Sequence, residues 1–174
     1  MNKCVEKDIE LDLTKARSVK NFDDDKTHGL SHCMKRVDWI VETDGKLLFI
    51  EVTDPQDPKA PAGEIDKFLR ELKDGRLDNE LYYKARDSFL YEWAMKNIFK
   101  PVVFIVLLSP DSLSDVVLQN FSYNLKKKVP VDGPPHKMWK QKFIHDCLVM
   151  NISLWNNTFP EYPVSRISNR PASS

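Results

Sequence analysis

The sequence has few cysteines, no net charge and no long apolar segment. Its three cysteines, Cys4, Cys33 and Cys147, are odd in number and show no paired spacing. This argues against a disulfide framework and against a zinc knuckle, and it favours a reducing, cytoplasmic setting. Lysine plus arginine and aspartate plus glutamate both number 26, so the overall charge neither favours nor excludes a polyanionic partner.

Nothing in the sequence predicts a membrane partner. The longest apolar run, VVFIVLL at residues 102–108, is too short to cross a bilayer. The first 18 residues are charged throughout and lack the apolar core of a signal peptide. A chain of 174 residues suits one domain, and we expect it over residues 1–160, followed by a mobile tail over 161–174.

The spacing of apolar and helix-capping residues predicts most elements of an α/β fold. Val5, Ile9, Leu13 and Ala16 predict a first helix over residues 3–20, and the polar residues 21–33 read as a loop or short strand. The proline-dense residues 53–63 predict a loop. We expect helices over 64–73 and 80–99, a buried strand over 102–108, a helix starting at Asp111 or Ser112 and ending at 126–128, and a strand or strand pair in 143–159.

Residues 34–55 predict a β-hairpin. Two runs rich in β-branched and aromatic residues flank Asp44-Gly45, and this dipeptide favours a two-residue hairpin loop. With this loop, Ile40 faces Phe49 and Val41 faces Leu48. Because side chains alternate along a strand, one face carries only apolar residues, namely Val37, Trp39, Val41, Leu48, Ile50 and Val52. That face should be buried.

The other face of the hairpin places Asp38 opposite Glu51 and Arg36 opposite Thr53. Two carboxylates directly across an antiparallel ladder lie about 4.5–5.5 Å apart at Cβ and repel one another. A hard divalent cation with oxygen ligands would remove this repulsion. Alternatively, the pair lies on a solvated outer face, where Arg36 neutralises it.

The segment 121–142 is strongly basic. It contains six lysines and a single acid, Asp132; the lysines are Lys126, Lys127, Lys128, Lys137, Lys140 and Lys142. These side chains predict contacts with nucleic-acid phosphates, and the alternative is a solvated helix end and loop.

The hairpin resembles the active-site motif of the PD-(D/E)XK nuclease superfamily. Asp38 matches the motif's Asp, and Glu51-Val52-Thr53 matches its E-x-K part. The resemblance implies a restriction-endonuclease-like core, in which a mixed central sheet with a β-hairpin over about 35–53 is flanked by helices. It covers residues 5–118 in the order of elements. Two departures are Thr53 at the lysine position and Val37 in place of the proline.

The resemblance also implies roles for these residues. Asp38 and Glu51 would bind Mg²⁺ or Mn²⁺, with the carbonyl of Val52 as a third ligand, and the family's lysine would activate or orient the attacking water. Since Thr53 carries no charge, Arg36 is the candidate replacement. Lys59 and Lys67 are further candidate cations, and Glu6 or Glu10 is a candidate additional ligand.

We therefore expect a metal-dependent nuclease with a divergent active site, acting on nucleic acid, with DNA favoured over RNA. The alternative is a catalytically inactive protein of the same fold, which binds nucleic acid, a protein partner in a larger complex, or a second copy of itself. A third hypothesis is a protein-interaction module of unrelated origin, in which case the hairpin register would be a coincidence.

Overall fold

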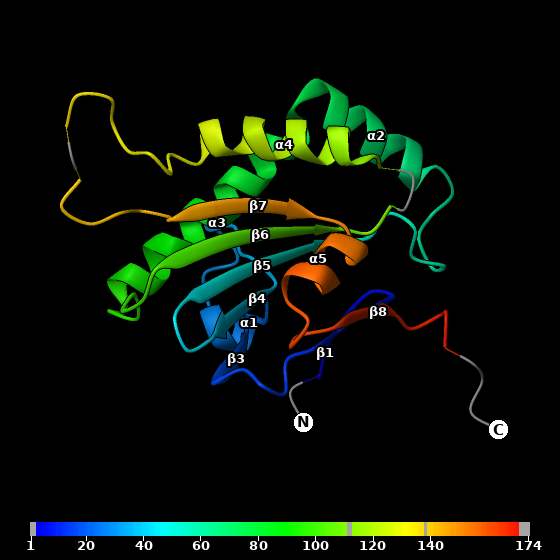
Figure 1. The fold of residues 1–174 in the computed structure, drawn as a ribbon, viewed down its shortest axis with the longest axis horizontal. Helices are drawn as coiled ribbons and strands as arrows, with labels where there is room; N and C mark the ends of the chain where they lie inside the picture. The colour runs from blue at the N-terminus through cyan, green and yellow to red at the C-terminus, as the bar shows by residue number, and fades with distance from the viewer. Residues whose placement is uncertain (1–2, 111–112, 138, 171–174) are drawn as a thin grey trace.

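A mixed sheet of five strands forms the centre of the fold in the computed structural model, which describes residues 3–110, 113–137 and 139–170 (Figure 1). In spatial order its strands are β3 (Ser18–Asn21), β4 (Trp39–Glu42), β5 (Leu47–Thr53), β6 (Val102–Leu108) and β7 (Asp146–Met150). The first three strands are antiparallel, whereas β6 and β7 run parallel to β5. The predictions of an α/β class and of a mixed sheet with a hairpin are confirmed.

The predicted helix over residues 3–20 is wrong, because this segment forms strands. β1 (Lys3–Glu6) pairs with β2 (Ile9–Asp12), and β2 pairs with β8 (Val164–Arg166) in a second, three-stranded sheet. Ile9, Leu11 and Leu13 are fully buried and alternate with polar residues, which is the period of a strand. The helical spacing rested partly on Val5, whose side chain is exposed.

Residues 164–168 also differ from the mobile tail predicted from residue 161. β8 pairs with β2, and the backbone N–H of Ile167 donates to the carbonyl of Asp8 at 2.8 Å. Residues 171–174 lie outside the described part of the chain.

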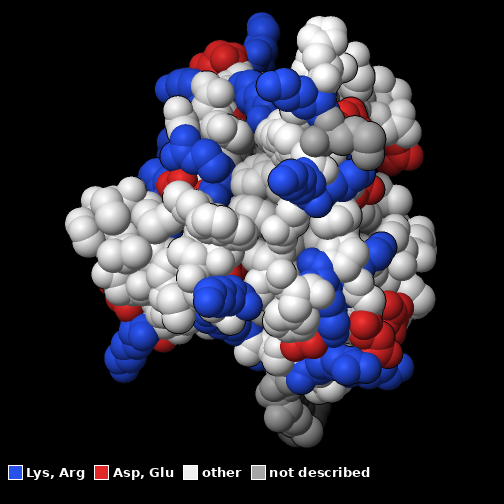
Figure 2. All heavy atoms as spheres, turned by 90° about the vertical axis from the view of Figure 1, so that its left-hand side faces the viewer, with Lys and Arg blue, Asp and Glu red and all other residues white. Residues whose placement is uncertain are grey.

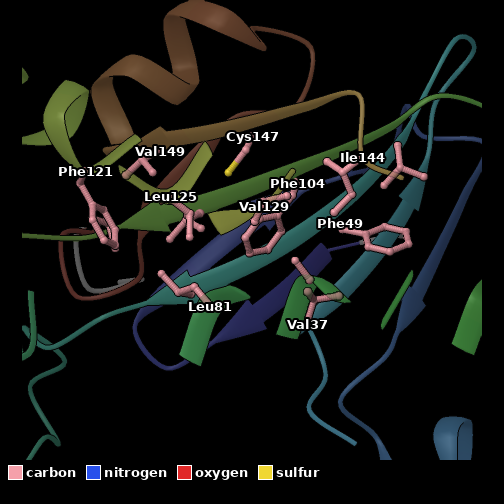
Figure 3. Close-up of a cluster of buried hydrophobic side chains, with 14 of the residues drawn as sticks. Val37, Phe49, Leu81, Phe104, Phe121, Leu125, Val129, Ile144, Cys147 and Val149 are labelled. Carbon is pink, nitrogen blue, oxygen red and sulfur yellow. The ribbon is translucent and has the colours of Figure 1, made fainter. Parts of the chain in front are cut away.

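Three helices cover one face of the central sheet, and the small sheet with α5 covers the other. The helical side consists of α2 (Glu64–Asp74), α3 (Arg76–Ala94) and α4 (Asp115–Lys128). Figure 3 shows part of the core on this side, in which Phe49 and Phe104 of the sheet belong to the same cluster of buried side chains as Leu81, Phe121 and Leu125 of the helices. On the opposite face, β2, β8 and α5 (Ile152–Thr158) pack in a separate cluster of buried side chains.

β6 is buried at every residue, which confirms the predicted central strand apolar on both faces. The predicted helix at 64–73 is α2, and the one predicted over 80–99 is α3, which starts and ends earlier. Gly75, at φ +74°, lets the chain turn directly from α2 into α3. Among the described residues, no helix is long and apolar enough to cross a bilayer.

Two boundary predictions have different outcomes. α4 begins after Ser114, whose side chain caps the helix by accepting a hydrogen bond from the N–H of Val117. The predicted caps Asp111 and Ser112 lie outside the described residues. In the segment 143–159 the first half is β7, but the second half is α5, a short helix capped by Asn151. A strand pair there is therefore wrong. The one-turn helix α1 (Asp25–His28) lies within the predicted loop.

Candidate functional site

The hairpin of β4 and β5 has the predicted register. Ile40 is paired with Phe49 and Val41 with Leu48, and the ladder runs as far as Trp39 and Ile50. Asp38 comes directly before this last pair, and its Oδ2 accepts a hydrogen bond of 2.7 Å from the backbone N–H of Val52. The strand pattern therefore located Asp38 and Glu51 correctly at one end of the hairpin.

Both faces of the hairpin are buried, so a solvated carboxylate pair is excluded. Asp38 is 6% exposed and Glu51 is 5% exposed, because the helical layer covers the face that also carries Ile40 and Phe49. Val37 belongs to this helix-facing cluster and not, as the alternation had predicted, to the cluster of Trp39. The backbone turns towards α3 before β4 begins, and the N–H of Val37 donates to the Oγ of Ser88 at 3.0 Å.

A lysine from α3 reaches this carboxylate pair. The Nζ of Lys84 lies 2.5 Å from the Oε1 of Glu51, and the lysine side chain is 19% exposed. Sequence reasoning missed Lys84 because it is 33 residues away from Glu51 in the chain. Only the packing of α3 against the sheet brings the two together, and the local pattern contained no sign of which helical face would do so.

Burial and neighbouring charges set the protonation of Asp38, Glu51 and Lys84. Desolvation, opposed by Lys84 and by the Val52 hydrogen bond, raises the pKa of Asp38 to about 6. Desolvation and the neighbouring Asp38 charge raise the pKa of Glu51 well above its usual value. Burial alone would lower the pKa of Lys84, but the charges of Glu51 and Asp38 outweigh it and raise that pKa. Lys84 therefore stays protonated beside the pair.

Arg36 does not take the position that the sequence predicted for it. Its guanidinium forms ion pairs with Asp23 at 2.9 Å and with Asp25 at 2.6 Å. It is thus bound to the acidic loop before the hairpin, and Lys84 is the cation in contact with Glu51.

The other residues that the sequence proposed for the site differ in how they relate to the carboxylate pair. Glu6 lies within the electrostatic environment of the site: burial raises its pKa, and Lys7 and Lys84 lower it. Glu10, in contrast, pairs with Lys3 and Arg170. Lys59 is exposed on the proline-dense loop, whose position between β5 and α2 was predicted correctly.

Glu51 of the carboxylate pair lines a cleft of about 220 Å³ between the end of β5 and the two helices α2 and α3, whereas Asp38 is not among the described residues of its lining. Thr53 and Lys67 lie in its wall with Glu51 and Lys84. Further charged side chains in the lining are Lys7, Glu64, Glu71 and Glu80. The cleft is therefore rich in charges of both signs, which suits a polar ligand or an ion.

One oxygen of the site has no partner. The Oε2 of Glu51 is buried and, within the described part of the protein, forms no hydrogen bond. A buried polar atom without a partner is costly, and a bound water, ion or ligand would satisfy it. The described residues contain no group of three or more His, Cys, Asp or Glu side chains arranged to hold a metal. Asp38 and Glu51 therefore remain the predicted carboxylate ligands of a cation, together with the carbonyl of Val52.

A second buried polar cluster lies beyond the ends of β5 and β6. Arg166 of β8 donates to Asp54 at 3.1 Å, to Asp8 at 3.2 Å and to the carbonyl of Ser109 at 3.2 Å. The hydroxyl of Ser109 donates to Asp54. These contacts join the small sheet to the central sheet. No local pattern indicates this cluster, because Arg166 is more than a hundred positions away from both Asp8 and Asp54 in the chain.

The six basic-segment lysines fall into two groups. On α4, Lys126 pairs with Asp146 at 2.7 Å, Lys127 lies over the ring of Tyr123, and Lys128 donates to Asn79 at 2.8 Å. The other three, Lys137, Lys140 and Lys142, are exposed on the loop between α4 and β7. The α4 group is engaged within the protein, whereas the loop group is accessible to a partner.

Comparison of the chain with protein-family models, with curated proteins and with solved structures finds no significant match.

Proposed function

We propose that this protein is a divalent-metal-dependent phosphodiesterase that acts on nucleic acid, with Asp38, Glu51 and Lys84 as its active-site residues. The observation that carries the proposal is the unpartnered, buried Oε2 of Glu51, next to a second desolvated carboxylate, Asp38, and the half-buried Lys84. Such perturbed groups gathered in a cleft are typical of functional sites.

The donor set fits a hard cation. Asp38 and Glu51 offer carboxylate oxygens, the ligands that Mg²⁺ and Mn²⁺ prefer. Burial is the main cause of their raised pKa values, and a bound cation would offset the cost of burying their charges. When bound, the metal would supply Lewis-acid activation of the phosphodiester and of the attacking water.

Lys84 would supply the positive charge that the motif resemblance lacks at Thr53. Because its pKa is raised, it remains protonated and cannot act as a general base near neutral pH. It can stabilise negative charge that develops on the phosphate or orient the attacking water. Lys84 thus replaces Arg36 in our proposal. The mixed sheet with helices against it is compatible with the restriction-endonuclease-like core, which remains part of the proposal.

The test is cleavage of supercoiled plasmid and of single-stranded circular DNA, with Mg²⁺ or Mn²⁺. We expect the wild type to cut these substrates. The cleavage rate should fall by about 100-fold or more in Asp38→Asn, Glu51→Gln and Lys84→Met, which is the effect of removing one electrostatic group from an active site. Lys67→Met is the matched control, because Lys67 lines the same cleft but pairs with Glu64 at 3.2 Å. It should retain most of the activity.

Two results would contradict the proposal. One is a wild type that cuts neither DNA nor RNA with either metal. The other is an activity that survives in Glu51→Gln, since this would indicate a contaminating nuclease.

The direct ion pair of Lys84 with Glu51 also supports a second candidate, a nuclease-like protein without catalysis. In that case Lys84 neutralises the pair permanently, and no metal is required. Thermal melts distinguish the two. A metal site predicts stabilisation of about 2.7 kcal/mol at a hundred times the dissociation constant, lost in Asp38→Asn. Equal melting temperatures with and without Mn²⁺ would favour the inactive protein.

A further inference from the structure

A second cleft, of about 370 Å³, lies between α3 and the loop that follows α4. Its walls are mainly aromatic. Phe89 and Trp93 come from α3, and Trp139 and Phe143 come from the loop. Both tryptophans are accessible, since Trp93 is 54% and Trp139 is 38% exposed. Tyr82 of α3 is a fifth ring in the lining. Phe89 belongs to the buried core and Phe143 packs against that core, so the two exposed tryptophans are the rings that offer stacking surfaces to a ligand.

The rings are held in place by neighbouring groups. Phe89 and Phe143 pack edge to face, with centroids 4.5 Å apart. A Cβ at Gly133 would lie 3.4 Å from the ring of Trp139, so this indole rests against the glycine backbone. The cleft is therefore formed before any ligand binds, which lowers the entropic cost of binding.

The charges around this cleft are positive. Arg86 and Lys142 line it, and no acid is among the described residues of its lining. Arg86 pairs with Asp87 at 2.8 Å and stacks over Tyr83 at 4.7 Å. Lys140, also on the loop, is exposed. Figure 2 looks onto this side of the molecule and shows lysine and arginine predominating over acids around a central uncharged area.

We propose that the aromatic cleft between α3 and the 129–145 loop binds single-stranded DNA, with bases stacked on Trp139 and Trp93 and phosphates beside Arg86 and Lys142. Rings flanked by cations are the combination that binds unpaired bases with their backbone. A duplex would hide the base faces. The lining is largely apolar, and Gln141 is the side-chain amide among its described residues. Because an apolar surface offers few partners to the 2′-hydroxyl of RNA, the cleft is better suited to deoxyribose.

This cleft and the carboxylate site lie on different sides of the same helix. Tyr82, Arg86, Phe89 and Trp93 recur at helical spacing along one face of α3. Lys84 lies two residues from both Tyr82 and Arg86, which at about 3.6 residues per turn is the opposite flank. A bound strand would therefore cross α3 to reach Glu51. The proposal rests on the proposed function for the choice of a nucleic acid as partner, and it names unpaired DNA as the form recognised.

The test measures binding in EDTA, where no metal-dependent cleavage occurs. Fluorescence anisotropy compares a labelled thymidine oligonucleotide, an abasic oligonucleotide of equal length, a uridine oligonucleotide and a blunt duplex. We expect the thymidine strand to bind most tightly. Trp139→Ala should weaken it by about fivefold to a hundredfold, the range for loss of one stacked base, and Trp139→Phe should weaken it less. Phe99→Ala is the control, because Phe99 is an exposed ring outside the cleft.

Equal affinity for the thymidine and abasic strands would overturn the proposal, as would tighter binding of the duplex or of the RNA, or no binding at all. Dimers of the wild type in sedimentation that dissociate in Trp139→Ala, without DNA binding, would identify the cleft as an interface between two copies instead. The two proposals can fail separately. A protein that cuts DNA but binds equally well after Trp139→Ala refutes only this cleft, and one that binds through Trp139 but never cuts refutes only the nuclease.

Discussion

At the scale of single residues, Asp38 links pH to stability. Its pKa is raised to about 6, chiefly by burial. A carboxyl group whose pKa is higher in the folded than in the unfolded protein binds a proton on folding. Its contribution is therefore most favourable at low pH, and stability falls as pH rises from about 4 through about 6.

Asp38→Asn should remove this dependence. The amide can still accept the hydrogen bond from Val52 but carries no charge to desolvate, so we expect the free energy of unfolding at pH 7 without metal to rise by about 2–3 kcal/mol. Urea unfolding between pH 4 and pH 7 measures this. Asp44→Asn is the control: Asp44 is exposed at the hairpin loop, and its hydrogen bond with Arg17 lowers its pKa, so this variant should gain no stability. A less stable Asp38→Asn at pH 7 would contradict the assignment.

The sequence predicted one half of this site and not the other. Asp38 and Glu51 followed from the alternation of a strand and a two-residue loop, both of which are local rules. Lys84 and the burial of the pair depend on how α3 packs against the sheet. Arg36 was assigned by extending the ladder past Trp39, but the backbone there turns towards α3 and the Arg36 side chain pairs with Asp23 and Asp25.

At the scale of elements, the basic segment separates into a helix and a loop with different roles. The α4 lysines contact Asp146, Tyr123 and Asn79, so a phosphate would have to compete with these partners. The loop lysines Lys137, Lys140 and Lys142 are exposed, and Lys142 lines the aromatic cleft.

Two triple variants should therefore differ. Replacement of Lys137, Lys140 and Lys142 by Gln should make oligonucleotide binding less dependent on salt. The slope of log affinity against log salt concentration should become shallower by about 0.7 for each phosphate that is no longer neutralised. The same change at residues 126–128 should have a smaller effect. Anisotropy titrations over a series of salt concentrations measure both slopes. A larger effect of the changes at residues 126–128 would indicate that the phosphates bind at α4.

Elements with one dominant period were predicted well, and ambiguous ones were not. β6 and α2 carry clear patterns, whereas residues 3–20 contain apolar residues at both helical and alternating spacing. In the structure Ile9 and Leu11 pair with β1 on one side and with β8, more than 150 residues later, on the other, and this pairing selects the strand. A local pattern contains no information about that partner.

At the scale of the whole molecule, Arg166 joins the two sheets. Its side chain is 9% exposed and its partner Asp54 is fully buried, so removing the guanidinium leaves buried carboxylates without a counter-ion. Loss of one partner of a buried ion pair typically costs about 3–5 kcal/mol.

Arg166→Met should therefore lower the free energy of unfolding by about 3–5 kcal/mol, measured by urea denaturation at pH 7. Arg170→Met is the matched control, because Arg170 pairs with Glu10 at 2.5 Å near the surface and is 43% exposed. Solvent screens an exposed pair, so this variant should lose much less stability. Equal losses in both variants would show that the Arg166 cluster is not the junction that stabilises the fold.

The small sheet also sets an order of events during synthesis of the chain. The turn between β1 and β2 carries Lys7, which lines the carboxylate cleft, and Asp8, which is bound by Arg166 and by Ser168 at 2.6 Å. These two partners leave the ribosome long after the turn that they fix. A nascent chain can form the central hairpin early, but one wall of its cleft waits for residues 164–168. Translation must therefore pass β8 before the cleft is complete.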